Sequence, residues 1–199
     1  MKVVRSARDM AKLSAKLNHQ GKRIGFVPTM GALHEGHLSL VRAACAHNDV
    51  VIVSIFVNPL QFGPSEDFSH YPRTLAKDLR LCKESRADIV FCPSHSEIYP
   101  EDFQTTLEIS RLSKLWEGKH RGGHFSGVAT VVTILFGLTH PTNAYFGQKD
   151  YQQCLIVRRL AEDLRLPIRI HMLPTVREHD GLAMSSRNTY LRYEERKDA

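Results

Sequence analysis

The stretch RIGFVPTMGALHEGHLSLVRAACAHNDVVIVSIFV, residues 23–57, decides the fold class. It begins with a short apolar strand pattern at 23–29 and continues, through a turn with glycines and histidines, into a helix pattern at 36–48. It ends in an unbroken apolar, β-branched run at 49–57. Unbroken apolar strands are typical of parallel sheets that helices cover on both faces. The stretch therefore predicts one strand–helix–strand unit of an α/β fold.

The same alternation extends along the rest of the chain. An amphipathic helix is predicted at 6–20, with Ser6 as its N-cap and Gly21 as its stop. Further helices are predicted at 73–87, 127–138 and 151–165, and further strands at 88–93, 143–147 and 167–173. Alternating strands and helices favour a doubly wound α/β fold with a parallel sheet.

The composition is that of an ordinary globular protein. Hydrophobic residues make up 42% and charged residues 24% of the 199 residues, so a sizeable core is expected. The formal net charge of +6 favours anionic ligands such as nucleotides or carboxylates and permits nucleic acid. A basic surface without a dedicated ligand is the alternative that composition leaves open.

The four cysteines are widely spaced and form no CxxC pair. This spacing indicates small buried residues in a reducing cytosol rather than a disulfide framework or a zinc ribbon. No segment has the roughly 18 consecutive apolar residues that a membrane-spanning helix needs. A soluble, cytoplasmic protein is therefore expected.

The turn after the first long strand carries the strongest chemical pattern, HEGH at 34–37. Ligands of doubly wound sheets bind beyond the carboxyl ends of the strands. Gly31 permits a tight turn, and a helix that starts near Gly36 directs free N–H groups at an anion. His34 and His37 are then placed to donate hydrogen bonds to a phosphate. The alternatives are a zinc site, for which no further ligand lies nearby, and two core histidines without a function.

Polar residues follow the next strand as well. Asn58 and Gln61 lie in a loop rich in Pro and Gly, where their amides can orient a hydroxyl or a carboxylate. For Asn58 the competing interpretation is turn chemistry, since Asn-Pro commonly begins a turn.

Two later motifs suit phosphates. After a strand that ends at Gly147, Lys149 can pair with a phosphate, and Asp150 can cap the next helix or bind an adenosine group or a metal. In MSSRN, residues 184–188, two hydroxyls and a guanidinium can clamp a polyphosphate. The alternative for the first motif is that Asp150 only caps the next helix and Lys149 is only exposed to solvent. HRGGH at 120–124 is basic and Gly-rich but has no strand before it.

Taken together, these motifs resemble a known family. HEGH and MSSRN resemble the HIGH and KMSKS signatures of the nucleotidyltransferase superfamily. Within that superfamily, the chain resembles the pantothenate synthetase family from about residue 22 to residue 190. The segments that carry this resemblance are PTMGALHEGH, SIFVNPLQFGPSEDFSHYPRT, GHFSGVATVV, FGQKDYQQ and MSSRN.

The resemblance implies a Rossmann-like domain and an ATP-dependent ligase. Pantoate and ATP would form pantoyl adenylate and pyrophosphate, and β-alanine would then displace AMP to give pantothenate. It also implies Mg²⁺ with the triphosphate and a homodimer, with no nucleic-acid or membrane partner. The alternatives are another HIGH-motif adenylyltransferase and an RNA-binding, synthetase-like fragment.

The site residues follow from the same resemblance. His37, which the family assigns as proton donor, His34 and Lys149 would be catalytic. The acid substrates would be bound by Gln61, Gln153 and Asn58, with both glutamines on pantoate and Gln61 also on β-alanine. The residues expected to contact ATP are Met30, Gly31, Ala32, Leu33, His34, Glu35, Gly36, His37, Gly147, Gln148, Lys149, Asp150, Val176, Met184, Ser185, Ser186 and Arg187.

Two departures from the family pattern qualify these expectations. Gln148 stands where the family usually has Glu, and tolerance is expected because the position contributes mostly backbone. Residues 1–175 are expected to form the ATP- and pantoate-binding domain, and 176–199 only the start of a small C-terminal lid domain. A truncated form with reduced activity and a loosely packed end is therefore expected.

Overall fold

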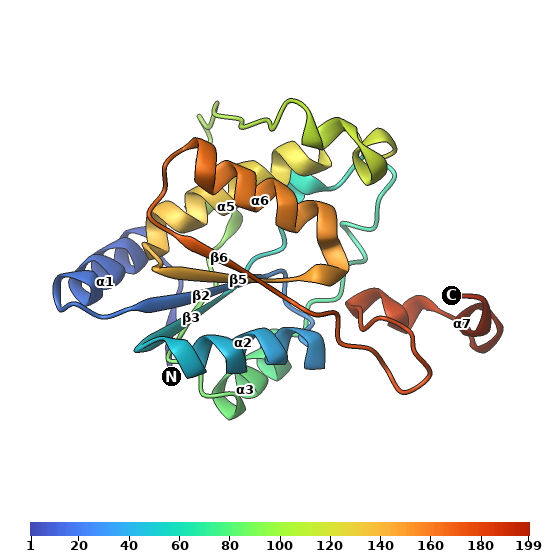
Figure 1. The fold of residues 1–199 in the computed structure, drawn as a ribbon, viewed down its shortest axis with the longest axis horizontal. Helices are drawn as coiled ribbons and strands as arrows, with labels where there is room; N and C mark the ends of the chain where they lie inside the picture. Colours follow the sequence, from blue (N-terminus) through green and yellow to red (C-terminus); the bar gives the residue numbers. More distant parts are fainter.

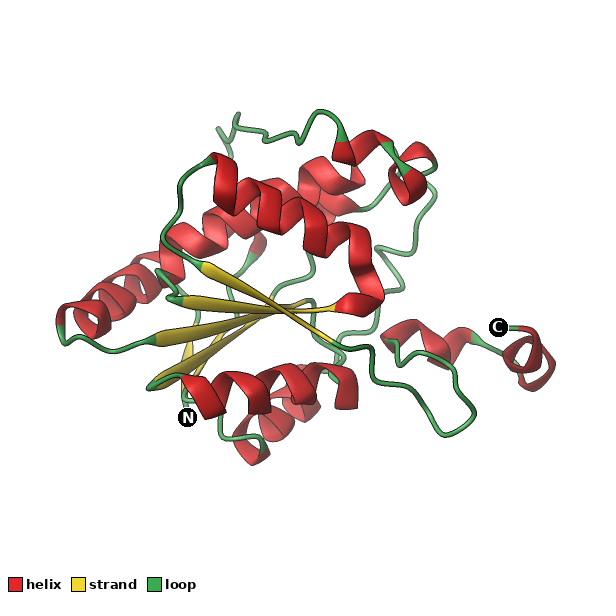
Figure 2. Ribbon diagram, in the orientation of Figure 1, coloured by secondary structure: helices red, strands yellow, loops and turns green.

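The computed structural model describes residues 1–199, apart from the side chain of Tyr193. Its centre is one six-stranded sheet in the order β1-β4-β3-β2-β5-β6, in which every pair of neighbours is parallel (Figures 1 and 2). The predicted doubly wound α/β fold is confirmed. The strands are β1 (Lys2–Val4), β2 (Ile24–Thr29), β3 (Val50–Ile55), β4 (Ile89–Phe91), β5 (Asn143–Gly147) and β6 (Arg169–Leu173).

Helices cover both faces of this sheet (Figure 2). The α-helices are α1 (Ala7–His19), α2 (Glu35–His47), α3 (Leu75–Glu84), α4 (His95–Ile98), α5 (His124–Thr139), α6 (Tyr151–Asp163) and α7 (Tyr193–Asp198). Short 3-10 helices are η1 (Pro59–Gln61), η2 (Leu112–Lys114), η3 (Trp116–Lys119), η4 (Gln148–Asp150) and η5 (Ser186–Tyr190).

The alternation of side chains along the strands divides the core in two. Phe26 and Ile52 face a cluster that contains residues of α1, α5 and α6. Val27 and Val53 point the other way, into a cluster with residues of α2 and α3. Because the strands are buried on both faces, they appear in the sequence as continuous apolar runs.

The strand order reverses between β2 and β5. From β2 the chain adds β3 and β4 on one side, and it then returns to add β5 and β6 on the other. The loops that leave β2 and β5 therefore diverge, and they open a crevice at the carboxyl ends of these strands. This topology fixes where a ligand site can lie.

The predicted elements agree with the structure except at some boundaries. Ser6 caps α1, since its hydroxyl accepts a hydrogen bond from Asp9 N at 3.3 Å. The strand predicted at 49–57 ends at Ile55, because the chain turns into the loop that holds the buried Asn58. The edge strand β1 was not predicted, since three residues give too short a pattern.

Beyond β6 the chain leaves the sheet and extends to one side (Figure 1). Residues 174–199 form an isolated antiparallel bridge, Arg177 with Ala183, followed by η5 and α7. The described side chains of this segment are exposed or half-buried. Polar contacts attach it to residues 67–71, and the loose packing expected of this segment stays a prediction. Within the described residues, no helix is both long and apolar enough to cross a membrane.

Candidate functional site

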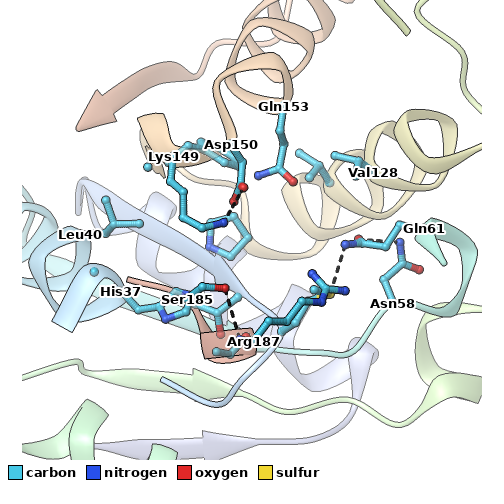
Figure 3. A pocket seen from close by; sticks show the side chains of 18 of the residues that line it. His37, Leu40, Asn58, Gln61, Val128, Lys149, Asp150, Gln153, Ser185 and Arg187 are labelled. Atoms are coloured by element: carbon cyan, nitrogen blue, oxygen red, sulfur yellow. Dashed lines mark hydrogen bonds and ion pairs between the residues drawn. The ribbon is translucent and has the colours of Figure 1, made fainter. Parts of the chain in front are cut away.

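A cavity lies at the carboxyl ends of β2, β3, β5 and β6, where the strand order reverses. Figure 3 shows side chains converging on it from separate segments of the chain. His37 and Gln61 lie toward opposite ends of this view, Lys149, Asp150 and Gln153 enter from above, and Ser185 and Arg187 lie below them.

The turn from β2 into α2 forms one wall of the cavity. Gly31 and Ala32 both have positive φ, +82° and +49°, which bends the chain sharply away from the sheet. The buried carboxylate of Asp78 holds this turn, since it accepts hydrogen bonds from Ala32 N at 3.0 Å and Leu33 N at 2.8 Å. The N–H groups of Ala32 and Leu33 are thus bound to Asp78, and His34 and His37, which follow, face the cavity.

His34 and His37 form a close, tilted pair with ring centroids 4.1 Å apart. Gly36 makes room for this arrangement, because a Cβ there would lie 3.0 Å from the His34 ring. His34 Nδ1 is buried and has no hydrogen-bond partner among the described residues. An unpaired buried ring nitrogen in a cavity wall is a group that a ligand can satisfy.

Both histidines are neutral in this environment. Burial, with smaller contributions from His34 and Lys149, lowers the pKa of His37 to about 3. Burial and the Lys149 ammonium also lower the pKa of His34. His37 Nδ1 accepts a hydrogen bond from His34 N at 3.4 Å, so the proton of the neutral ring lies on Nε2. His37 therefore offers an Nε2–H donor to the cavity rather than a positive charge.

Asn58 and Gln61 form the opposite end of the cavity. Asn58 is buried, with Oδ1 accepting from Tyr99 Oη at 2.7 Å and Nδ2 donating to Gln61 Oε1 at 3.1 Å. Gln61 Nε2 lies 3.1 Å from Met30 Sδ, a weak acceptor that a better ligand can replace. Asn58 therefore orients Gln61, and the Gln61 amide is the group available to a substrate.

Lys149, Asp150 and Gln153 line the cavity from η4 and the start of α6. Lys149 Nζ lies 2.9 Å from Asp150 Oδ1. Asp150 is at the N-cap position of α6, but its side chain makes no capping hydrogen bond. The capping role that competed for Asp150 is therefore wrong, and the carboxylate is directed to Lys149 instead.

Arg121 and His124 line the cavity beside Gln61. His124 Nδ1 lies 2.7 Å from Gln61 O, and His124 Nε2 lies 3.0 Å from Arg121 Nη1. Arg121 also donates to Glu66 and Glu117. Sequence reasoning set the HRGGH motif aside because no strand precedes it. Its place in the site depends on the contact between His124 and the loop after β3, which no local pattern reveals.

Ser185, Ser186 and Arg187 complete the cavity from the segment beyond β6. Ser186 Oγ lies 3.0 Å from Tyr71 Oη, and Arg187 forms an ion pair with Asp67. Asp67, Tyr71 and Asp78 were not predicted as site residues. For Asp78 the only signal was an acidic residue on a helix that packs below the turn, which is not specific.

The structure brings most of the predicted residues together and leaves five outside the cavity. Those that line it are Met30, His34, Gly36, His37, Asn58, Gln61, Gly147, Lys149, Asp150, Gln153, Val176, Met184, Ser185, Ser186 and Arg187. Gly31, Ala32, Leu33, Glu35 and Gln148 do not line it.

Each of these five has a physical reason for its position. Leu33 is 3% exposed and packs in the core below α2, while Gly31 and Ala32 shape the turn through their backbone. The Glu35 carboxylate points outward and pairs with Arg42. The Gln148 side chain is exposed to solvent. The side chains of Ala32, Leu33, Glu35 and Gln148 therefore do not face the cavity, and contact with ATP at these five positions stays a prediction.

No metal site is preformed in the described residues, in which no group of three or more His, Cys, Asp or Glu side chains is placed to hold an ion. Asp150 is a carboxylate at the cavity wall. Mg²⁺ is usually bound by one or two carboxylates together with substrate phosphates, and this donor set fits that mode.

Comparisons with known proteins agree on one family. The sequence model described as Pantoate-beta-alanine ligase matches residues 2–199. A pantothenate synthetase of Thermosipho africanus is 55% identical over 199 residues, which cover 100% of this chain and 72% of that protein. A crystal structure of pantothenate synthetase from Thermus thermophilus is 52% identical with a TM-score of 0.95, covering 100% of this chain and 71% of the other.

A second solved structure carries ligands. The pantoate-beta-alanine ligase of Francisella tularensis, complexed with beta-gamma ATP and beta-alanine, is 42% identical with a TM-score of 0.92. The match covers 97% of this chain and 74% of that one.

Proposed function

The chain belongs to the pantoate-beta-alanine ligase family, and we propose that the cavity at the β2–β5 switch point is the site where it joins pantoate to β-alanine at the expense of ATP. The observation that carries this assignment is the convergence of His34 and His37, Gln61 and Gln153, and Lys149 with Ser185–Arg187 in one cavity. These groups come from the ends of different strands, and they meet only in the folded chain.

The reaction proceeds in two steps. The pantoate carboxylate attacks the α-phosphorus of ATP, which forms pantoyl adenylate and expels pyrophosphate. The β-alanine amine then attacks the activated carbonyl carbon, and AMP leaves as pantothenate forms. Neither step needs a covalent bond to the protein, so catalysis rests on positioning and on stabilising phosphate charge.

The phosphates would lie between the His34–His37 pair and Lys149. His37 would act as a neutral Nε2–H donor to phosphate oxygens, because its pKa of about 3 leaves it unprotonated near pH 7. Lys149 would exchange Asp150 for a phosphate, and Asp150 would be available to Mg²⁺ that accompanies the triphosphate. Mg²⁺ supplies charge neutralisation of the triphosphate.

The acid substrates would occupy the end of the cavity near Gln61 and Gln153. Two amides suit a hydroxy acid, since each can donate and accept. A phosphorylated acceptor would call for a free cation there, and the cation present, Arg121, is already paired with two carboxylates, Glu66 and Glu117. This pairing supports a small carboxylic acid over the phosphorylated substrate of another adenylyltransferase.

Three broader features belong to the same proposal. Residues 1–175 would act as the ATP- and pantoate-binding domain, and 176–199 as part of a lid over ATP. The chain would form a homodimer in the cytoplasm. Light scattering in solution tests the dimer, and a monomer mass at every concentration measured would contradict it.

The proposed reaction is tested by pyrophosphate release from ATP under four conditions. We expect release with pantoate, sustained release with pantoate and β-alanine together, and only background release with ATP alone or with β-alanine alone. Release that depends on β-alanine but not on pantoate would contradict the order of the two steps. Salt-sensitive RNA binding without pyrophosphate release would favour the RNA-binding alternative.

A further inference from the structure

Two neighbouring carboxylates in the loop after β3 each hold one arginine of the cavity wall. Glu66 accepts hydrogen bonds from Arg121 Nε and Nη2, both at 2.7 Å. Asp67 accepts from Arg187 Nε at 2.9 Å and Nη2 at 2.7 Å. Two-point contacts of this kind fix the plane of a guanidinium as well as its position.

The surroundings of Arg187 fix it further. Its guanidinium carbon lies 5.8 Å from the centre of the Phe62 ring and 5.4 Å from that of Tyr71. Both rings and Asp67 belong to the loop after β3, whereas Arg187 belongs to the segment beyond β6. Within the described part of the chain, Nη1 of Arg187 has no hydrogen-bond partner, while the residue itself lines the cavity.

We propose that Asp67 is a positioning residue for ATP: it holds Arg187 so that the unused Nη1 edge of the guanidinium faces the phosphates. The inference rests on the proposed function in that it places ATP phosphates beside Ser185–Arg187. Asp67 itself does not line the cavity, so it acts through Arg187 rather than on the nucleotide.

In the competing arrangement, Asp67 and the phosphates would compete for the same N–H groups of Arg187. The geometry favours positioning, because Asp67 uses Nε and Nη2 and leaves a further edge available. An arginine that is already ordered also loses less rotamer freedom when it binds a ligand. Asp67 lowers the net positive charge around Arg187, so the proposal requires that the ordering of the guanidinium outweighs this loss of attraction to the phosphates.

Glu66 provides an internal comparison for Asp67. Arg121 Nη1 contacts Glu117 at 2.7 Å and His124 Nε2 at 3.0 Å, so the remaining edge of this guanidinium is used within the protein. His124 in turn contacts the backbone oxygen of Gln61. Loss of the Glu66 charge should therefore disturb the Gln61 end of the cavity and leave the phosphate end unchanged.

The test measures ATP affinity by calorimetry in the absence of acid substrates, and KM and kcat for each substrate. We expect Asp67→Asn to weaken ATP binding about tenfold, the loss typical of one charge-assisted hydrogen bond, with little change in the KM of pantoate. Asp67→Glu should restore part of the affinity. Glu66→Gln should raise the KM of the acid substrates and leave ATP affinity within about twofold.

A double-mutant cycle tests whether Asp67 affects ATP binding through Arg187. If Asp67 acts through Arg187, the Asp67→Asn/Arg187→Ala variant should bind ATP no more weakly than Arg187→Ala alone. Asp163→Asn breaks an exposed ion pair with Arg159 on α6 and serves as the control for removing a surface carboxylate.

Three results would overturn the proposal. Tighter ATP binding by Asp67→Asn would mean that Asp67 competes with the phosphates. Equal loss of ATP affinity in Glu66→Gln would mean that both carboxylates only maintain the loop. Additive losses in the double variant would mean that Asp67 does not act through Arg187. Failure of pantoate-dependent pyrophosphate release in the unmodified chain would instead contradict the proposed function, and the ATP titrations would remain informative.

Discussion

The two walls of the cavity are built in different ways. The inner wall consists of residues at the ends of β2, β3 and β5, such as His37 and Gln61, which are held by elements of the buried sheet. The outer wall consists of Ser185–Arg187, which lie beyond the last strand and are held by Asp67 and Tyr71. The first wall is fixed by the core, and the second by a few polar contacts between two loops.

This difference indicates a division of labour. Groups that must be in place before a substrate arrives, such as a donor for a developing phosphate charge, belong on the rigid wall. Groups that close around a bound nucleotide belong on the wall that lies outside the buried core and opens at small cost. Variants on the two walls should therefore behave differently in stability and in activity.

The largest contrast should appear in stability. Phe26 is fully buried in β2, so Phe26→Ala should lower the free energy of unfolding by about 3–5 kcal/mol. Tyr190 is 46% exposed at the end of η5, the 3-10 helix that contains Ser186 and Arg187 of the outer wall, and Tyr190→Ala should cost less than about 1 kcal/mol. Urea unfolding measures both. Similar losses for the two variants would mean that the outer wall is part of the same cooperative core.

The next largest effect should be on chemistry at the inner wall. His37→Ala should lower adenylate formation by about 100-fold or more with the fold retained, since one lost donor to developing charge typically costs about 3 kcal/mol. Single-turnover pyrophosphate release measures it. His47→Ala, an exposed residue at the other end of α2, is the control. Unchanged release by His37→Ala would remove His37 from the mechanism.

The sequence allowed much of the inner wall to be predicted, because its residues follow directly from strand–turn–helix patterns. HEGH, Asn58, Gln61 and Lys149 each come just after an apolar strand, and parallel strands bring their carboxyl ends together. Turn residues whose side chains point outward, such as Glu35, could not be distinguished from those that point inward.

The outer wall and the supporting contacts were less predictable. Asp67 and Arg187 are 120 residues apart in the chain, and neither has a local pattern that indicates the other. Asp78 supports the His34 turn from α3 across the edge of the sheet. Such partners are set by tertiary packing, which local sequence patterns do not reveal.

Gln153 and Gln152 are neighbours in α6 that should affect different properties, ligand binding and stability. Gln153→Ala should weaken pantoate binding by about 1–3 kcal/mol and leave ATP binding nearly unchanged, because it removes an amide from the acid end of the cavity. Gln152 instead binds the backbone of Leu112, Leu115 and Glu117, so Gln152→Ala should mainly lower thermal stability. Calorimetry with each ligand tests this, and equal losses of pantoate and ATP affinity for Gln153→Ala would count against it.

A smaller effect is expected in the pH dependence of stability. The unfolded chain protonates His37 near pH 6.5, whereas burial holds its pKa at about 3 in the folded chain. Acid therefore favours the unfolded state, and the low pKa of His37 should cost roughly 1 kcal/mol of stability at pH 5.5 and nothing above pH 7.5.

Unfolding of the unmodified chain and of His37→Gln at both pH values isolates this contribution. The variant should lose roughly 1 kcal/mol less stability than the unmodified chain between pH 7.5 and pH 5.5. His47→Gln controls for the loss of an imidazole at an exposed position of the same helix. An identical pH dependence in His37→Gln and the unmodified chain would show that folding does not lower the pKa of His37.

The difference between the walls is tested most directly by amide hydrogen exchange with and without ATP and pantoate. Without ligands, amides of η5 (Ser186–Tyr190) should exchange at least about tenfold faster than those in the middle of α2 (Glu35–His47). Ligands should slow exchange in η5 and change α2 little. Equal protection of the two segments in the ligand-free protein, unaltered by ATP, would contradict the account of one rigid and one exchangeable wall.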